Sequence, residues 1–301
     1  MQAHPTRGTT RAEVGTSRKR RVMSEHPRRH LLLVLLGAGG LILLGGIIGV
    51  ALLLSGALST DATKQHFRVT HRVLDVGLEY SVNASADDSV VPSLDDPDVL
   101  SHGAACYREH CVACHGAPGV PPESFALGML PVPASLAHTA TTHPPEWLHH
   151  VTRKGVRMTG MPAWEYRLSE DSLWAVVAFL ETLPDLDLNG YRAAMESSAG
   201  ANCEARASVP PREEGADVLL RQYGCHSCHR IEGVVGPRVD TGPPLVDWRR
   251  RAYIAGVLPN TKRNLARWIM DPPAVSPQTL MPDMGVAPEH ARAMADFLFS
   301  Q

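Results

Sequence analysis

The feature that most constrains the fold of this chain is a run of 24 residues without a charged side chain, Leu31 to Leu54. Its sequence is LLLVLLGAGGLILLGGIIGVALLL. As a helix with a rise of ~1.5 Å per residue, the run would be ~36 Å long. This length is enough to cross a hydrocarbon core of ~30 Å with some tilt. We therefore predict a transmembrane anchor at 31–54.

Charge is distributed unevenly on the two sides of this run. Residues 1–30 contain eight Lys or Arg against two Glu, a net charge of +6, so the remainder carries −8 of the total of −2. The positive-inside rule places a basic tail, 1–30, in the cytoplasm and the rest in the periplasm. We expect a single-pass protein of the inner (cytoplasmic) membrane. A cleavable signal peptide is the alternative, although its apolar region has only ~7–15 residues.

The part after the run contains two segments with the same order of features. The sequence CVACH at 111–115 returns as CHSCH at 225–229. Each copy follows a predicted helix and precedes a Gly/Pro-rich loop, a short helix, a Met-Pro motif and a closing helix. The predicted helices are 97–109, 145–154 and 169–184 in the first segment, and 213–223, 261–271 and 288–299 in the second. Apolar residues recur at intervals of three and four in the closing helices, and no strand pattern is present, so we expect a mostly α chain.

These features divide the chain into six parts. After the tail and the anchor come a juxtamembrane segment and linker at 55–95, a first domain at 96–185, a second linker at 186–211 and a second domain at 212–301. A short amphipathic helix is expected near 65–80, and the second linker is polar and irregular in sequence. A length of 301 residues is compatible with about two domains.

The pattern Cys-X-X-Cys-His is typical of covalent haem attachment. Its two cysteines form thioethers with the vinyl groups of one haem, and its histidine becomes the proximal iron ligand. A thioredoxin-like dithiol would need a βαβ setting, and a structural zinc site would need four ligands in one cluster. Pairing the two motifs could supply those ligands but would leave the Met-Pro motifs unexplained. We expect two haem c groups, held by Cys111 and Cys114 with His115, and by Cys225 and Cys228 with His229.

A Met-Pro pair follows each motif, Met161 in GMPAW and Met281 in LMPDM. Methionine sulfur is a soft ligand that, together with histidine, raises the reduction potential of haem iron. The proline after each methionine lacks an N–H and stiffens the loop. We predict Met161 and Met281 as the sixth iron ligands, with Met158 and Met284 as nearby competitors. The alternative is that these methionines only fill gaps in a core.

With these motifs, and with the stretches KGVRMTGMPAW and GPPL…RAYIAGVLPNT…MPDMGV, the chain resembles a membrane-anchored dihaem member of the class I cytochrome c family. The resemblance implies one anchor helix followed by two tandem class I cytochrome c-like helical domains. It implies that the carbonyl of Pro243 orients His229, with a looser match at Pro133, and that Gly103 lets the closing helix pack. It also implies that Arg251, Tyr253 and Trp268 contact the second haem, and that Trp147 and Trp164 contact the first. The alternative is that the aromatic residues only fill a core and that the arginine is an ordinary surface residue.

Two cysteines and a group of histidines lie outside the motifs. Cys106 and Cys203 could form a disulfide that ties the second linker to the first domain, or could remain buried free thiols. A metal site is one interpretation of the clustered histidines, but we favour solvated loop residues for His138, His143, His149 and His150. The low aromatic content, 5%, is compatible with two cores that each contain a haem.

Two Met/His haems leave no open iron position for a substrate, so we expect an electron-transfer protein rather than an enzyme. The resemblance implies a relay of single electrons in a respiratory chain, to or within a terminal oxidase. The alternatives are a dihaem enzyme of the peroxidase or thiosulfate-oxidising type, and the cytochrome subunit of a periplasmic dehydrogenase. The expected partners are a terminal oxidase, a quinol–cytochrome c reductase or a dehydrogenase complex, together with the membrane. No nucleic-acid partner is expected.

Overall fold

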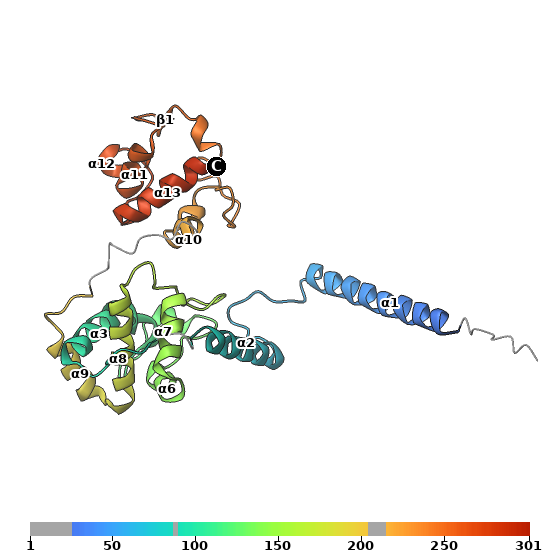
Figure 1. Cartoon of the computed structure of the whole chain (residues 1–301), viewed down its shortest axis with the longest axis horizontal. Helices are drawn as coiled ribbons and strands as arrows, with labels where there is room; N and C mark the ends of the chain where they lie inside the picture. The colour runs from blue at the N-terminus through green and yellow to red at the C-terminus, as the bar shows by residue number, and fades with distance from the viewer. Residues whose placement is uncertain (1–25, 87–89, 204–214) are drawn as a thin grey trace, which may run out of the picture. The chain divides into compact units, whose positions relative to one another are not determined.

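The computed structural model describes residues 26–86, 90–203 and 215–301 (Figure 1). The chain divides into two units, 1–64 and 65–301. Nearly all of the predicted basic tail, and residues 204–211 of the predicted second linker, lie outside the described residues.

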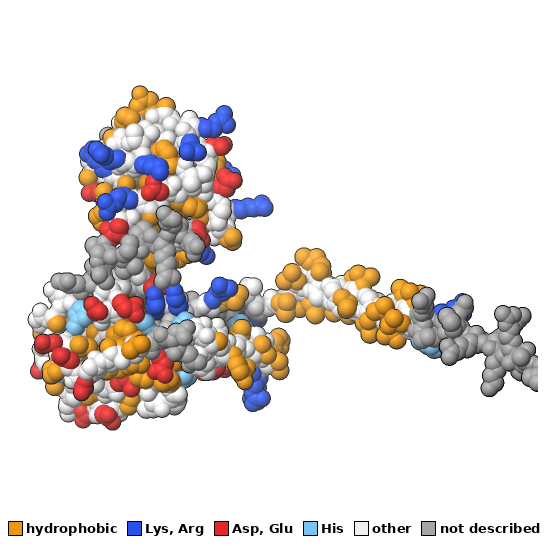
Figure 2. Space-filling model, viewed as in Figure 1, with side chains coloured by type: hydrophobic (Ala, Val, Ile, Leu, Met, Phe, Trp, Pro, Cys, Tyr) orange, Lys and Arg blue, Asp and Glu red, His pale blue; other side chains and the backbone are white. Residues whose placement is uncertain are grey.

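The first unit contains one helix, α1 (His26–Leu54), among its described residues. This helix contains the whole predicted anchor and begins five residues before it. Hydrophobic side chains cover it in Figure 2, and its leucines and isoleucines are exposed. Its length and composition suit either a membrane anchor or a signal sequence.

The second unit begins with α2 (Arg68–Ala86), which packs against α7 (Pro145–Lys154). The sequence predicted a shorter amphipathic helix here, ending near residue 80. The helix continues to Ala86 because Val82 and Ala86 are buried against the first hydrophobic core, at 4% and 3% exposure. Part of the stretch that we predicted as a linker is therefore packed structure.

The first core is built around the contact between α3 (Pro97–His110) and α8 (Glu170–Thr182). Asp96 caps α3 by accepting a hydrogen bond from the N–H of Asp98, and Ser169 caps α8 in the same way from Ser172. A Cβ added at Gly103 would lie 1.9 Å from the carbonyl oxygen of Ala175, so only glycine permits this crossing. The remaining elements of this half are α4 (Val112–His115), α5 (Ser124–Leu127), α6 (Leu136–Thr142) and η1 (Leu183–Asp185).

A further helix, α9 (Leu188–Ser197), lies where the sequence indicated an irregular linker. Asp187 caps it by accepting a hydrogen bond from the N–H of Gly190 at 2.7 Å. Tyr191 is buried in the first core, and Arg108 of α3 donates to the side chain of Ser198 at 3.2 Å. The interpretation as irregular chain is therefore wrong for α9, which packs on α3.

The second half packs around its own hydrophobic core, in which α11 (Lys262–Met270) and α13 (Pro288–Ser300) lie together. The shorter helical elements are α10 (Ala216–Gln222), η3 (Cys225–Ser227), η4 (Trp248–Arg250) and α12 (Pro272–Val275). Two short antiparallel strands, β1 (Tyr253–Ile254) and β2 (Leu258–Pro259), pair Ile254 with Leu258. The sequence did not predict this hairpin, because two residues are too few to show an alternating pattern.

Candidate functional site

The first Cys-X-X-Cys-His motif forms a single helical turn at the end of α3. Cys111 closes α3 through a hydrogen bond from its N–H to the carbonyl of Tyr107, and the N–H of His115 returns to the carbonyl of Cys111 at 3.0 Å. Gly116 ends the turn with a φ of +64°, and a Cβ there would lie 2.5 Å from the carbonyl oxygen of Val120. This turn places both cysteines and the histidine within one short, fixed segment.

The second motif is held in a similar local way. Gly224 precedes it with a φ of +69°, and the N–H of His229 donates to the carbonyl of Cys225 at 2.9 Å. The following loop folds back on the motif, because the N–H of Gly242 donates to the carbonyl of Cys228 at 2.8 Å. A Cβ added at Gly242 would lie 2.4 Å from the His229 ring, so glycine is required for this close approach.

Both motif histidines are oriented by a backbone carbonyl. The Nδ1 atom of His115 lies 2.8 Å from the carbonyl oxygen of Ala134, and that of His229 lies 2.7 Å from the carbonyl oxygen of Pro243. A carbonyl only accepts, so Nδ1 carries the proton and Nε2 keeps its lone pair for a metal. The hydrogen bond that the resemblance implied for Pro243 is present. At the first site, Ala134 has this place instead of the neighbouring Pro133.

The environment of the motif cysteines does not favour a zinc site or a redox dithiol, the two alternatives to haem. Burial raises the pKa of Cys111 to about 12 and that of Cys225 to about 11. Zinc ligands and redox dithiols react as thiolates, which such burial disfavours, whereas a thioether is neutral. Cys111 also belongs to the first hydrophobic core and Cys225 contacts the second. The structure therefore does not favour pairing of the two motifs in one zinc cluster.

The two predicted methionine ligands lie in loops with the same internal hydrogen bond. The N–H of Met161 donates to Oγ1 of Thr159 at 3.0 Å, and that of Met281 donates to Oγ1 of Thr279 at 3.1 Å. The pattern Thr-X-Met-Pro occurs in the sequence at both places and is a signal from which this hydrogen bond could have been predicted. Met161 and Met281 are half-buried.

The competing methionines differ from these two in their surroundings. Met158 is 89% exposed and Met284 is 45% exposed, so neither is enclosed by the protein as a core ligand would be. Met129, which no sequence motif marks, is half-buried beside the first loop. A Cβ added at Gly160 would lie 1.9 Å from the terminal methyl carbon of Met129. Met129 is therefore the strongest competitor of Met161.

Two buried indole groups have unpaired N–H donors among the described residues. They are Nε1 of Trp147, which was predicted to contact the first haem, and Nε1 of Trp248, which was not among the predicted contacts. An unsatisfied buried donor costs ~1–3 kcal/mol, and a haem propionate is an acceptor that would satisfy it. The guanidinium of Arg251 lies 4.6 Å from the centre of the Trp248 ring and donates to the carbonyl of Pro244.

The other predicted haem contacts have different environments. Trp164 is half-buried with its ring 4.9 Å from that of His110, and Trp268 is 8% exposed within α11. Tyr253 is 61% exposed on β1, so most of its ring faces solvent. The thiols, the oriented histidines, the methionine loops and the unpaired indole donors together fit a covalently bound haem in each half.

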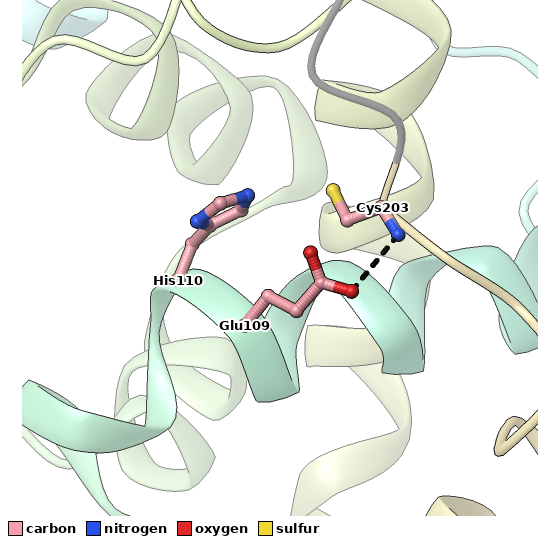
Figure 3. Close-up of side chains that lie close together, drawn as sticks. All are labelled: Glu109, His110 and Cys203. Carbon is pink, nitrogen blue, oxygen red and sulfur yellow. Dashed lines mark hydrogen bonds between the residues drawn. The ribbon is translucent and has the colours of Figure 1, made fainter. Parts of the chain in front are cut away.

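Cys106 and Cys203 form a disulfide that links α3 to the chain after α9. Figure 3 shows Cys203 beside Glu109 and His110, an arrangement in which the ligand atoms lie within 4.8 Å of one another. This group is not a metal site, because the sulfur of Cys203 is bonded to Cys106 and Glu109 accepts a hydrogen bond from the Cys203 N–H at 3.2 Å.

The clustered histidines are not all solvated, as the sequence analysis expected. His149 is only 2% exposed, and its ring stacks on that of Trp174 at 4.0 Å with Nε2 3.0 Å from a Glu170 oxygen. The Nε2 atom of His143 lies 2.9 Å from a Glu79 oxygen of α2. The expectation is wrong for these two residues. His149 lies on the face of α7 that packs in the core, and α2 covers His143.

Comparison with known protein families shows that the first Cys-X-X-Cys-His motif lies within a recognised domain. Residues 98–180 match the family of cytochrome C oxidase, cbb3-type, subunit III. The matched range contains Cys111, Cys114, His115 and Met161. Residues 98–180 are a cytochrome c domain. A domain of this family implies covalently bound haem c and suggests haem-based electron transfer. Comparisons with curated proteins and with solved structures gave no match.

Proposed function

We propose that this protein is a membrane-tethered, periplasmic dihaem cytochrome c that relays single electrons in a respiratory chain, to or within a terminal oxidase. One observation carries the proposal. The histidine of a Cys-X-X-Cys-His turn, inside a cytochrome c domain, has its Nδ1 fixed by a carbonyl, and the same arrangement recurs at His229. This geometry would leave each Nε2 atom available to bind one haem iron.

Three features of the second half support a second haem. Its Cys-X-X-Cys-His motif, its carbonyl-bound histidine and its Thr-X-Met-Pro loop each have a counterpart in the matched domain. The Arg251 and Trp248 pair adds a cation and an unpaired N–H donor beside this core. A carboxylate-bearing group such as a haem propionate would be stabilised by both.

The haem, when bound, supplies the one-electron chemistry, and the residues of this chain set its properties. His115 and Met161 would hold the first iron, and His229 and Met281 would hold the second. Two axial protein ligands favour electron transfer over substrate binding, and methionine favours a higher reduction potential. We therefore propose a carrier rather than an enzyme.

The disulfide and the anchor support a periplasmic location. Disulfides form and persist in oxidising compartments such as the bacterial periplasm. Both cysteines follow α1 in the sequence and the basic tail precedes it, so the positive-inside rule would put the disulfide in the periplasm if α1 spans the membrane. A terminal oxidase is the proposed partner because the matched family consists of oxidase subunits.

The test is a haem count on the full chain purified from membranes. The pyridine haemochrome assay should give two haem c per chain, and one after replacement of Cys225 and Cys228 by Ala. Carbon monoxide should bind slowly or not at all to the reduced protein, because both irons have two protein ligands. One haem in the unmodified chain would refute the dihaem proposal, and rapid carbon monoxide binding would refute the carrier proposal. Affinity purification from membranes should recover terminal oxidase subunits, and their absence would refute the proposed partner.

A further inference from the structure

Helix α2 has two different faces. On one face, Val82 and Ala86 are buried and Leu78 is half-buried against the first hydrophobic core. Glu79 on this helix also pairs with His143. These contacts fix the helix on the cytochrome c domain, so its orientation relative to that domain is defined.

The opposite face of α2 carries an exposed apolar stripe. Its members are spaced by four, three and four residues, which places them on one side of a helix. Their exposures are 72%, 64%, 54% and 76% for Val69, Val73, Val76 and Tyr80. Phe67, immediately before the helix, is 78% exposed. Figure 2 shows hydrophobic side chains over α2 with Lys or Arg beside them. Contiguous exposed apolar surface of this kind marks an interaction site.

Charge beside the stripe indicates what covers it. Arg68 and Arg72 precede and flank the stripe, and no carboxylate among the described residues forms an ion pair with either of them. The acidic residues of the helix are paired with histidines instead, Asp75 with His71 and Glu79 with His143. Helices that lie in a membrane interface combine an apolar face with Arg or Lys that bind lipid phosphates.

The position of α2 in the chain points to the same partner. Only 13 residues, 55–67, separate the end of α1 from the start of α2. Fully extended at ~3.5 Å per residue, they reach ~45 Å at most. If α1 spans the membrane, the stripe cannot leave the neighbourhood of the bilayer surface. The tether therefore keeps the stripe at a high local concentration of lipid.

We propose that α2 is an interfacial helix whose apolar stripe inserts into the periplasmic leaflet of the membrane that α1 spans, with Arg68 and Arg72 at the lipid phosphates. Because the other face of α2 is fixed on the domain, this insertion determines which side of the cytochrome c domain faces the bilayer. The inference rests on the proposed anchoring by α1.

The test uses the full chain in lipid nanodiscs that contain anionic phospholipid and no protein besides the scaffold protein of the disc. A photo-crosslinking amino acid is placed at Val73 in the stripe, and at Ser85, an exposed residue on another side of α2, as the matched control. Illumination should give a phospholipid adduct at position 73 and not at position 85. In a second experiment the probe is placed at Val69. The double substitution Val73→Asp and Val76→Asp should then abolish the phospholipid adduct at position 69. An unchanged haem spectrum shows that these variants are folded.

The other occupants of the stripe would give different products. A dimer adduct at position 73 in discs that hold two chains would identify a second copy and overturn the proposal, as would equal lipid adducts at both positions. In native membranes, an adduct to another protein in place of lipid would also overturn it. Retention of the chain after alkaline extraction reports α1 anchoring separately, so a failure of the stripe is distinguished from a failure of the anchor.

Discussion

Replacing Gly103 by Ala tests the central helix crossing of the first core. The added Cβ would lie 1.9 Å from the carbonyl oxygen of Ala175 and 2.6 Å from its carbonyl carbon. Both atoms belong to the backbone of α8, so no side-chain rotation relieves the overlap. To restore a contact of ~3.5 Å, the two helices must separate by ~1.6 Å, and gaps of this size forfeit much of the dispersion energy between their surfaces.

The expected magnitude follows from two opposing effects. Overpacking of a well-packed core costs ~1–3 kcal/mol, and a backbone overlap of this depth belongs at the upper end. Exchange of glycine for alanine within a helix recovers ~1 kcal/mol of helix propensity. The net loss of stability is therefore ~2 kcal/mol. For a domain of ~60–100 residues, this loss lowers Tm by ~8–16 °C.

The measurement is thermal unfolding in detergent, followed by haem absorption in a chain whose Cys225 and Cys228 are replaced by Ala, so that only the first haem reports. Gly77→Ala is the matched control, because nothing lies within 4 Å of a Cβ added there on α2. The control should raise Tm or leave it unchanged. A Gly103→Ala variant that melts at or above the parent temperature would refute this close crossing of α3 and α8.

Further expectations concern the ligands and the buried histidine. Met161→Leu and Met281→Leu should each remove the weak red absorption band of Met–Fe(III) from one haem, whereas Met129→Leu should retain both. Loss of a band in the Met129 variant alone would assign the ligand to Met129. Burial lowers the pKa of His149, so the neutral ring is favoured in the folded state and stability declines as pH falls below ~6.5. Glu170 opposes this effect, so Glu170→Gln should steepen the acid loss of the urea midpoint, and an unchanged pH slope would contradict the assignment.

Local patterns in the sequence predicted the main helices well. The helix predicted at 145–154 has the bounds of α7, because Pro145 can begin a helix and Gly155, with a φ of +66°, ends it. The closing helices were also found, because their apolar residues repeat at the helical period over more than three turns. The cysteines and histidines of the two motifs could be identified without knowledge of distant contacts, since each motif is a single turn of chain.

The features that sequence reasoning missed depend on contacts between distant segments. The α9 sequence, LNGYRAAMES, mixes apolar and polar residues, and the burial of Tyr191 becomes visible only beside α3. The carbonyl that holds His115 belongs to Ala134, and a one-residue difference from Pro133 depends on the loop conformation. Burial of Trp248 requires the packing of η4 against α13.

The disulfide has a consequence for how the first domain is assembled. Cys106 lies five residues before Cys111, whereas its disulfide partner Cys203 lies 97 residues after Cys106. If the chain is exported to the proposed periplasmic location, Cys106, Cys111 and Cys114 would reach the oxidising compartment together, and Cys106 would meet two incorrect thiols before the correct one. Thiol–disulfide exchange operates only on free thiolates, so thioether formation removes Cys111 and Cys114 from competition. If both proposed haems attach first, Cys106 is left with Cys203 as its single partner, and we then expect the order of these covalent events to affect the yield of native protein.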